Sequence, residues 1–167
     1  MIIDADKKHI DSILKVTKSA FAVYKEKIKA DVKVKALDEK YEDVLYDIQN
    51  NKVFVSVDED GCLNGCIRVK KLSDDIAYIF RYSVDPKCHS QGVGSALINH
   101  VFDFCKTDNT AAIVLHSNAK NFELAKFYYG KGFYIHSTNL TPGYVRALFI
   151  KELRDKPYDL SPALNYN

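Results

Sequence analysis

The sequence has few glycines, almost no net charge and no long apolar run. Only seven of its 167 residues are glycine. The 24 lysine and arginine residues nearly balance 22 acidic residues, so a net charge of +2 gives little attraction for nucleic acid or an anionic membrane. No stretch approaches the roughly 20 apolar residues of a membrane span, and the N-terminus lacks a signal-peptide core. We therefore expect a cytoplasmic protein without nucleic-acid or membrane partners.

Cysteines are also few, and their spacing does not predict a metal site. Cys62 and Cys66 have the spacing of one half of a zinc site, but no second pair follows them. Cys88 and Cys105 each stand alone in the sequence. We expect four free, reduced thiols and no bound metal.

The length and composition are typical of a single domain. A chain of 167 residues, of which 47% are hydrophobic, is long enough for one buried core and short for two. We find no internal repeat, low-complexity segment or interdomain linker. Only the last stretch, RDKPYDLSPALNYN, looks separable from the rest. We expect one domain at residues 1–153 and a C-terminal tail at residues 154–167.

The spacing of apolar residues alternates between helical and strand-like along the chain. Helical spacing occurs at residues 10–24, 37–48, 97–105 and 118–129, with Asp6 as the expected first N-cap. Strand-like runs occur at residues 53–57, 62–70, 76–84, 111–116, 133–137 and 144–153. Gly61 is the expected turn between the first two strands, in preference to Asn64 and Gly65. The pattern predicts an α+β, or mixed α/β, fold.

Two of the few glycines lie close together in HSQGVG, between the strand at residues 76–84 and the following helix. A helix start leaves backbone N–H groups without helical partners, and glycine lets a phosphate approach them. The GK[ST] ending of a nucleotide-binding P-loop is absent, and so is the third glycine of a dinucleotide fingerprint. This stretch alone therefore fits either a phosphate site or a tight turn that permits close packing.

A second stretch, NFELAKFYYGKGF, favours the phosphate site. Together with VDP and HSQGVG it resembles the motifs of the GNAT superfamily of acyl-CoA-dependent N-acyltransferases, in which V-x-P precedes an R/Q-x-x-G-x-G/A loop and N-x-x-A-x-x-x-Y-x-x-x-G-F follows. The matching residues are Val84, Pro86, Gly92, Gly94, Asn121, Tyr128, Gly132 and Phe133, whereas Leu124 stands where the family prefers alanine. The resemblance implies a GNAT-like fold, with a largely antiparallel sheet of about six or seven strands flanked by about four helices.

The resemblance also implies acetyl-CoA as co-substrate. Its pantetheine arm would bond the backbone of Tyr82, Ser83 and Val84 as an added strand. Its pyrophosphate would rest on the loop amides, which belong to Ser90, Gln91, Gly92, Val93, Gly94 and Ser95. His89 stands where the family prefers arginine or glutamine, and can still donate a hydrogen bond. Asn121 would reach the arm through its amide, or alternatively cap a helix.

Acetyl transfer to an amine needs a proton acceptor for the ammonium and a proton donor for the leaving thiolate. Tyr128 occupies the family's position for the acid, whereas the adjacent Tyr129 does not. His116, at the end of a strand, is our candidate base. Asp74, Asp75 and a relay of waters remain alternatives.

The acceptor is less well defined. The resemblance places it between residues 24–37 and residues 138–144, where Tyr24, Glu26 and Asp31 could meet a cationic amine. A small-molecule or peptide amine is expected, and a homodimer stays open. The leading hypothesis is an N-acetyltransferase that works by direct attack in a ternary complex. The alternative is a catalytically silent acyl-CoA-binding sensor or assembly module.

Overall fold

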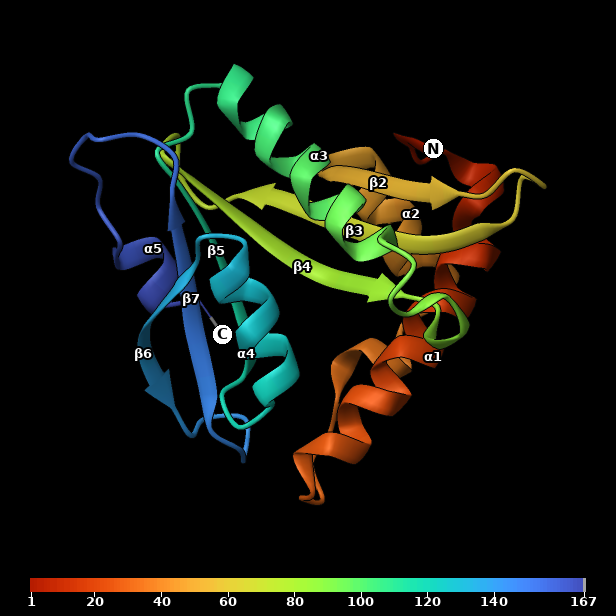
Figure 1. Cartoon of the computed structure of the whole chain (residues 1–167), viewed down its shortest axis with the longest axis horizontal. Coiled ribbons are helices and arrows are strands. Elements are labelled where there is room, and N and C mark those ends of the chain that lie inside the picture. Colours follow the sequence, from red (N-terminus) through yellow and green to blue (C-terminus); the bar gives the residue numbers. More distant parts are fainter. Residues whose placement is uncertain (167) are drawn as a thin grey trace.

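The computed structural model describes residues 1–166 and contains a seven-stranded sheet (Figure 1). Its strand order is β1-β2-β3-β4-β5-β7-β6, and every neighbouring pair is antiparallel except β4 and β5. The strands are β1 (Ile2–Asp4), β2 (Lys52–Val57), β3 (Leu63–Lys71), β4 (Ile76–Val84), β5 (Ala112–Asn118), β6 (Tyr134–Asn139) and β7 (Arg146–Glu152). The structure confirms the expected mixed α/β fold with a largely antiparallel sheet.

Helices cover both faces of the sheet. They are α1 (Ile10–Ile28), α2 (Tyr41–Asn50), α3 (Val93–Thr107), α4 (Phe122–Gly130) and the short α5 (Ser161–Leu164). Three 3₁₀ turns accompany them, at Lys7–His9, Lys35–Asp38 and Pro86–Cys88. Helices α3 and α4 lie on one face, and α1, α2 and α5 lie on the other (Figure 1).

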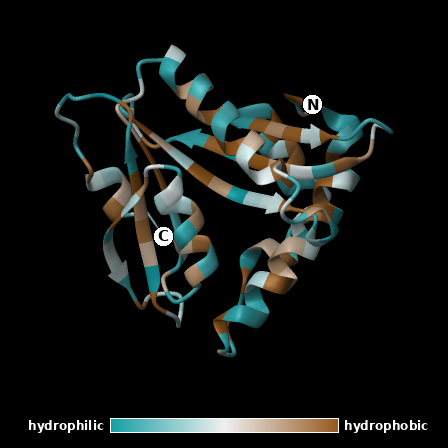
Figure 2. Cartoon of the chain, in the orientation of Figure 1, coloured by the Kyte–Doolittle hydropathy of each residue, from teal (hydrophilic) through white to brown (hydrophobic). Residues whose placement is uncertain are grey.

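The core follows from the alternation of side chains along the strands, because successive residues of a strand point to opposite faces. On β7, Ala147 and Phe149 pack toward α3 and α4, whereas Leu148 and Ile150 pack toward α5. Figure 2 shows the resulting concentration of apolar residues along the central strands. Arg146, two residues before Leu148, therefore lies on the α5 side of the sheet.

The two parallel strands separate soon after they begin. The ladder between β4 and β5 joins only Ile76–Tyr78 to Ala112–Val114. Beyond it, β4 continues to pair with β3 as far as Val84, and β5 with β7 as far as Asn118. The facing edges of both strands consequently lack a strand partner in this region. The divergence positions the site described below.

Several boundaries differ from the expected ones. The helix expected at residues 37–48 begins at Tyr41, after a 3₁₀ turn, because extended backbone at Glu39 interrupts it. The helix expected from Asn118 begins at Phe122, since Asn118 still belongs to β5. Gly61 forms the expected turn with a φ of 78°, and Asn64 and Gly65 lie within β3.

The C-terminal segment packs onto the sheet. Ala163 of α5 is fully buried, and Tyr158, Leu160 and Tyr166 pack against the cluster that contains Ile76 and Tyr78. The ring centroids of Tyr166 and Tyr78 are 4.5 Å apart. Residues 154–166 thus supply part of the cover of the second face.

Candidate functional site

A cavity of about 1690 Å³ opens where β4 and β5 diverge. Residues from both halves of the sheet, from the α1–α2 connection and from α3 and α4 line it. Most of the expected site residues are among them: Tyr82, Val84, His89, Ser90, Gly92, Val93, Gly94, Ser95, His116, Asn121 and Tyr128. Ser83 and Gln91 do not line the cavity.

The glycine loop presents free backbone donors to this cavity. Gly92 is the N-cap of α3 and has a φ of 81°, a conformation that favours glycine. Within residues 1–166, five N–H groups at this helix start donate to no backbone carbonyl, namely those of Ser90, Gly92, Val93, Gly94 and Ser95. Unpaired donors at the positive end of a helix dipole bind anions. The loop is therefore suited to a phosphate-bearing ligand.

Close packing also constrains this loop. A Cβ atom at Gly94 would lie 3.0 Å from the hydroxyl oxygen of Tyr82, whereas at Gly92 it would meet no atom within 4 Å. The Tyr82 hydroxyl donates to the carbonyl oxygen of Gly94 over 2.5 Å. Gly94 thus joins the loop to β4, and Gly92 faces open space where a ligand can approach.

Two expected binding residues have other contacts. The side chain of Ser83 is buried, and its hydroxyl donates to the Arg81 carbonyl over 3.2 Å. The backbone N–H of Gln91 donates to the Cys88 carbonyl over 3.3 Å, and its side chain is exposed. Any contact of Ser83 with a ligand would therefore involve its backbone.

The two adjacent tyrosines of α4 have different surroundings. Tyr128 is 6% exposed, and its ring packs against Phe133 and Phe149, with centroid separations of 5.7 and 5.1 Å. Burial raises the pKa of Tyr128 well above its ordinary value, so the phenol stays protonated. Tyr129 is 53% exposed, and its hydroxyl accepts from the N–H of Ile135. Only Tyr128 lines the cavity.

Asn121 caps α4 and also lines the cavity. Its side-chain oxygen accepts from the N–H of Leu124 over 3.2 Å, so the capping role considered from the sequence is present. Its side-chain nitrogen donates to no acceptor within residues 1–166. The cap therefore fixes the side chain while leaving the NH₂ group available to a ligand.

His116 lies on β5, on the α5 side of the sheet, and its Nδ1 is 2.9 Å from the Tyr78 hydroxyl oxygen. Burial, together with the positive charge of Arg146, lowers its pKa to about 4. The imidazole is consequently neutral near pH 7. If Nδ1–H donates to Tyr78, Nε2 is the nitrogen that can accept a proton.

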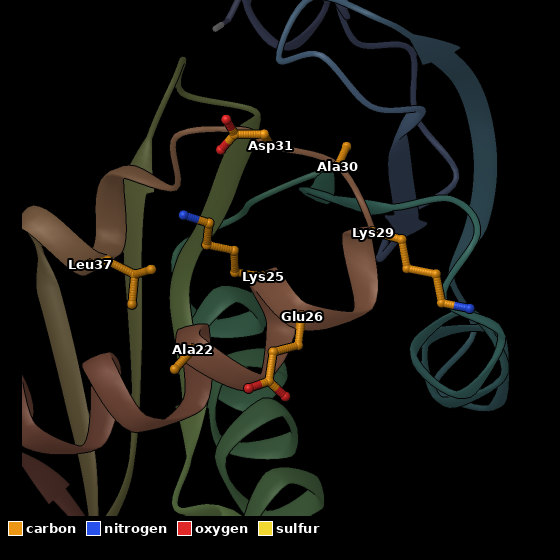
Figure 3. Close-up of a pocket in the computed structure, with 7 residues that line it drawn as sticks. All are labelled: Ala22, Lys25, Glu26, Lys29, Ala30, Asp31 and Leu37. Carbon is orange, nitrogen blue, oxygen red and sulfur yellow. The ribbon is translucent and has the colours of Figure 1, made fainter.

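The aspartates considered as alternative bases, and the two acids considered for acceptor binding, lie outside the cavity. Asp75 forms a 2.7 Å ion pair with Lys156 at the start of β4, and neither Asp74 nor Asp75 lines the cavity. Glu26 and Asp31 line a separate, shallow pocket at the end of α1. Figure 3 shows these two carboxylates pointing in different directions, with Lys25 beside them. The structure therefore does not bring these acids together with His116 and Tyr128.

A buried ion-pair network beside the cavity was not foreseen from the sequence. Arg68, which is fully buried, donates to both Glu39 oxygens over 2.7 and 2.8 Å and to Asp47 over 2.7 Å. Arg81 donates to the same Glu39 over 3.1 Å. An arginine between apolar neighbours inside a strand pattern, in Ile67-Arg68-Val69, was the signal that could have indicated it.

The cavity is also bridged on the side where the sequence analysis expects the acceptor. The hydroxyl oxygens of Tyr24 on α1 and Tyr144 before β7 are 3.1 Å apart, and Lys27 forms a 2.7 Å ion pair with Glu123 of α4. The expectation from the sequence named Tyr24 but not its partner. These contacts join the two halves of the sheet across the divergence.

Residues 1–166 contain no group of three or more His, Cys, Asp or Glu side chains that could hold a metal ion. All four cysteines in this range are unpaired. None of the helices in this part of the chain is long and apolar enough to cross a membrane.

The divergent strands, the free loop amides and the buried Tyr128 meet in one cavity, an arrangement suited to an elongated, phosphate-bearing ligand held against a sheet edge. A family model described as the acetyltransferase (GNAT) family matches residues 20–133, and the chain belongs to this family. The membership confirms the expected GNAT-type acyltransferase. The matched residues also include both motifs on which the resemblance was based.

Solved structures share the fold. The PaiA N-acetyltransferase from Thermoplasma acidophilum, in complex with coenzyme A, is 18% identical with a TM-score of 0.78, over 91% of this chain and 98% of that one. YncA, a putative acetyltransferase from Salmonella typhimurium with acetyl-CoA, is 14% identical with a TM-score of 0.75, over 95% and 96%. A GNAT-family acetyltransferase from Staphylococcus aureus is 15% identical with a TM-score of 0.72, over 92% and 99%. No curated protein matches the chain by sequence.

Proposed function

We propose that this protein transfers an acetyl group from acetyl-CoA to a primary amine by direct attack in a ternary complex. One observation carries the proposal: free loop amides lie next to the unpaired edge of β4, in one cavity with Tyr128. A ligand with a pyrophosphate and an amide-bearing arm fits this arrangement. The arm would add to β4 at Tyr82, Ser83 and Val84. The PaiA and YncA structures, which hold coenzyme A and acetyl-CoA, support this choice of co-substrate.

The loop residues supply the anion site. The amides of Ser90, Gly92, Val93, Gly94 and Ser95 would receive the pyrophosphate, and His89 lies beside them in the cavity. Asn121 would donate its free NH₂ group to the arm. Such contacts hold the thioester near the point where β4 and β5 separate, which is where an amine from the other face can reach it.

The chemistry needs two proton movements. The acceptor ammonium first loses a proton to a base, and the neutral amine then forms the C–N bond at the thioester carbon. The C–S bond breaks, negative charge develops on the departing sulfur, and the second proton that the attacking nitrogen gives up balances the one that the thiolate takes up. Tyr128, kept protonated by burial, would donate its hydroxyl hydrogen to that sulfur. Because its pKa exceeds the roughly 8.5 of an ordinary thiol, its main contribution is a hydrogen bond that strengthens as charge grows.

His116 is the proposed proton acceptor. Its imidazole lines the same cavity and is neutral at pH 7. A pKa of about 4 makes it a weak base, so it would accept the proton transiently and pass it on to solvent. A hydrogen bond from Nδ1–H to Tyr78 would orient Nε2 toward the amine.

The proposal is tested by following thiol release from acetyl-CoA with a thiol reagent across a panel of amines. The panel should contain amino acids, amino-acid amides, polyamines, aminoglycosides and peptides with free N-termini. Amine-dependent thiol release, with the acetylated amine identified by mass spectrometry, is expected. Tight acetyl-CoA binding without amine-dependent release would instead favour the catalytically silent acyl-CoA-binding module. Absence of binding would contradict both.

A further inference from the structure

Arg146 is an unpaired cation in the acceptor half of the cavity. It is the first residue of β7, opposite Asn118 of β5, and it lines the cavity together with His116 and Tyr78. Its Nε is buried and has no hydrogen-bond partner, and its guanidinium forms no ion pair within residues 1–166. A buried donor without a partner costs about 1–3 kcal/mol, so a ligand group that pairs with it would be favoured.

The other arginines beside the cavity are already neutralised. Arg68 is held by Glu39 and Asp47, and Arg81 is held by Glu39. Lys70 is surrounded by rings, with Nζ 4.8 Å from the centroid of Phe80 and 4.3 Å from that of Tyr166. Its ammonium donates to the Tyr166 hydroxyl and forms no ion pair in residues 1–166. Glu39 and Asp47 are therefore held by Arg68 and Arg81, and within residues 1–166 no carboxylate forms an ion pair with Arg146.

The charge of Arg146 reaches the reacting region. Arg146 lines the same cavity as His116 and Tyr78. Its positive charge adds to burial in lowering the pKa of His116. His116 pairs with Leu148 in the ladder, so Arg146 is its diagonal neighbour on the same face. Diagonal neighbours in an antiparallel pair lie roughly 7–8 Å apart. A small ligand can therefore span the two side chains.

We propose that the acceptor is an amine that also carries a carboxylate, and that Arg146 binds this carboxylate while the amine faces His116. Arginine suits this task because its guanidinium binds a carboxylate through two parallel N–H donors. A polycationic acceptor such as a polyamine would instead meet the unpaired charges of Arg146 and Lys70 at close range. The inference rests on the proposed acetyl transfer and narrows its substrate class to amino acids and related zwitterions.

The test compares matched substrates that differ only in the carboxylate. Thiol release from acetyl-CoA should be measured with L-amino acids, with their carboxamides and with the corresponding decarboxylated amines. We expect kcat/KM to be at least tenfold higher for the acid than for its carboxamide, chiefly through KM. In Arg146→Gln this preference for the acid over its carboxamide should fall at least tenfold. The comparison is between the acid-to-carboxamide ratio of kcat/KM in the variant and the same ratio in the wild type. Differences in amine basicity, and any effect of the variant on His116, cancel in this comparison.

A charge-matched control is Arg154→Gln, because Arg154 donates to the Lys106 carbonyl and does not line the cavity. It should keep the wild-type preference, and Arg146→Lys should recover part of it. Thermal unfolding and acetyl-CoA affinity should be measured for each variant, so that misfolding is recognised. Equal rates for acids and carboxamides would overturn the role of Arg146 and leave acetyl transfer standing. No amine-dependent release with any substrate would overturn both.

Discussion

At the scale of single residues, Tyr128 and Tyr129 show how neighbours on a helix acquire different roles. Adjacent helical residues point about 100° apart, so one faces the cavity and the other the surface. Removing only the Tyr128 hydroxyl leaves its ring packed but takes away the proposed hydrogen-bond donor for the departing sulfur. We expect Tyr128→Phe to lower kcat by about 10²-fold or more with little change in acetyl-CoA affinity. Steady-state kinetics and calorimetry measure the two quantities.

The matched control for this prediction is Tyr129→Phe. Its hydroxyl contacts only the N–H of Ile135 at the surface, so its kinetics should be close to wild type. If both variants behave alike, or if only Tyr129→Phe is impaired, the alignment of the second motif is shifted. The proposed role of Asn121, which rests on the same alignment, would then also be wrong.

His116 gives a prediction for stability as a function of pH. Its pKa is about 4 in the folded protein and 6.5 without the fold, so the unfolded chain binds more protons between these values. The free energy of unfolding should therefore fall as pH decreases from about 6.5 to about 4, by at most about 1.4 kcal/mol per pH unit from this group. Urea unfolding of His116→Gln across this range should show a shallower fall.

The surface residue His136 provides the comparison, since its side chain is exposed. His136→Gln should keep the wild-type dependence on pH. The same His116 variant also tests the proposed base. Its rate of acetyl transfer should fall on the order of a hundredfold or more, and its pH–rate profile should lack the acidic limb near pH 4. A variant that keeps the wild-type rate and the acidic limb would mean that water or another group accepts the proton.

At the scale of elements, the glycine loop between β4 and α3 is the feature on which the proposed acetyl-CoA binding depends. Valine at Gly92 would be strained at a φ of 81° and would project into the open space beside the free amides. We expect Gly92→Val to weaken acetyl-CoA binding at least tenfold, about 1.4 kcal/mol, by calorimetry. Gly61→Val carries the same strain, at a φ of 78° in a distant turn, and should lose stability but not affinity. Equal affinities in the two variants would place the pyrophosphate elsewhere.

The sequence predicts best the elements in which several apolar residues recur at helical or strand spacing. The strands β2 to β5 and the helix α3 lie where the spacing placed them, because their buried residues recur regularly. The strand β1 has three residues and α5 has four, too few to show a period. The start of α2 was predicted four residues early, since nothing local indicates that Glu39 leaves the helix to reach Arg68.

The residues of the candidate site also fall into those that the sequence predicts and those that it does not. Tyr128, Asn121 and the glycine loop are visible in the sequence because they belong to two short motifs with fixed spacing. Arg146 and Tyr78 belong to no motif. They meet His116 only through the pairing of β5 with β4 and β7. Residues assembled by long-range strand pairing carry no local signal, so the acceptor half of the site could not be predicted from spacing alone.

At the scale of the whole molecule, one buried ion-pair network ties the helical layer to the sheet beside the cavity. Arg68 comes from β3, Glu39 precedes α2, Asp47 lies within α2, and Arg81 lies on β4. Replacing buried ion pairs can be neutral when all partners change, but removing one partner leaves uncompensated charge. The network therefore specifies how the α1–α2 connection sits over the acceptor side.

Removing Arg68 should consequently destabilise the entire fold. Arg68→Met leaves the buried Glu39 and the largely buried Asp47 without their main partner, although Arg81 still reaches Glu39. We expect a loss of about 3 kcal/mol in the free energy of unfolding, measured as a lower urea midpoint at unchanged slope. Lys33→Met, which breaks an exposed 3.3 Å pair with Asp38, should change it by less than about 0.5 kcal/mol. Adding Glu39→Gln to Arg68→Met should recover part of the loss, because it removes the stranded charge. Failure of the double variant to recover any stability would mean that Arg68 acts through packing and not through its charge.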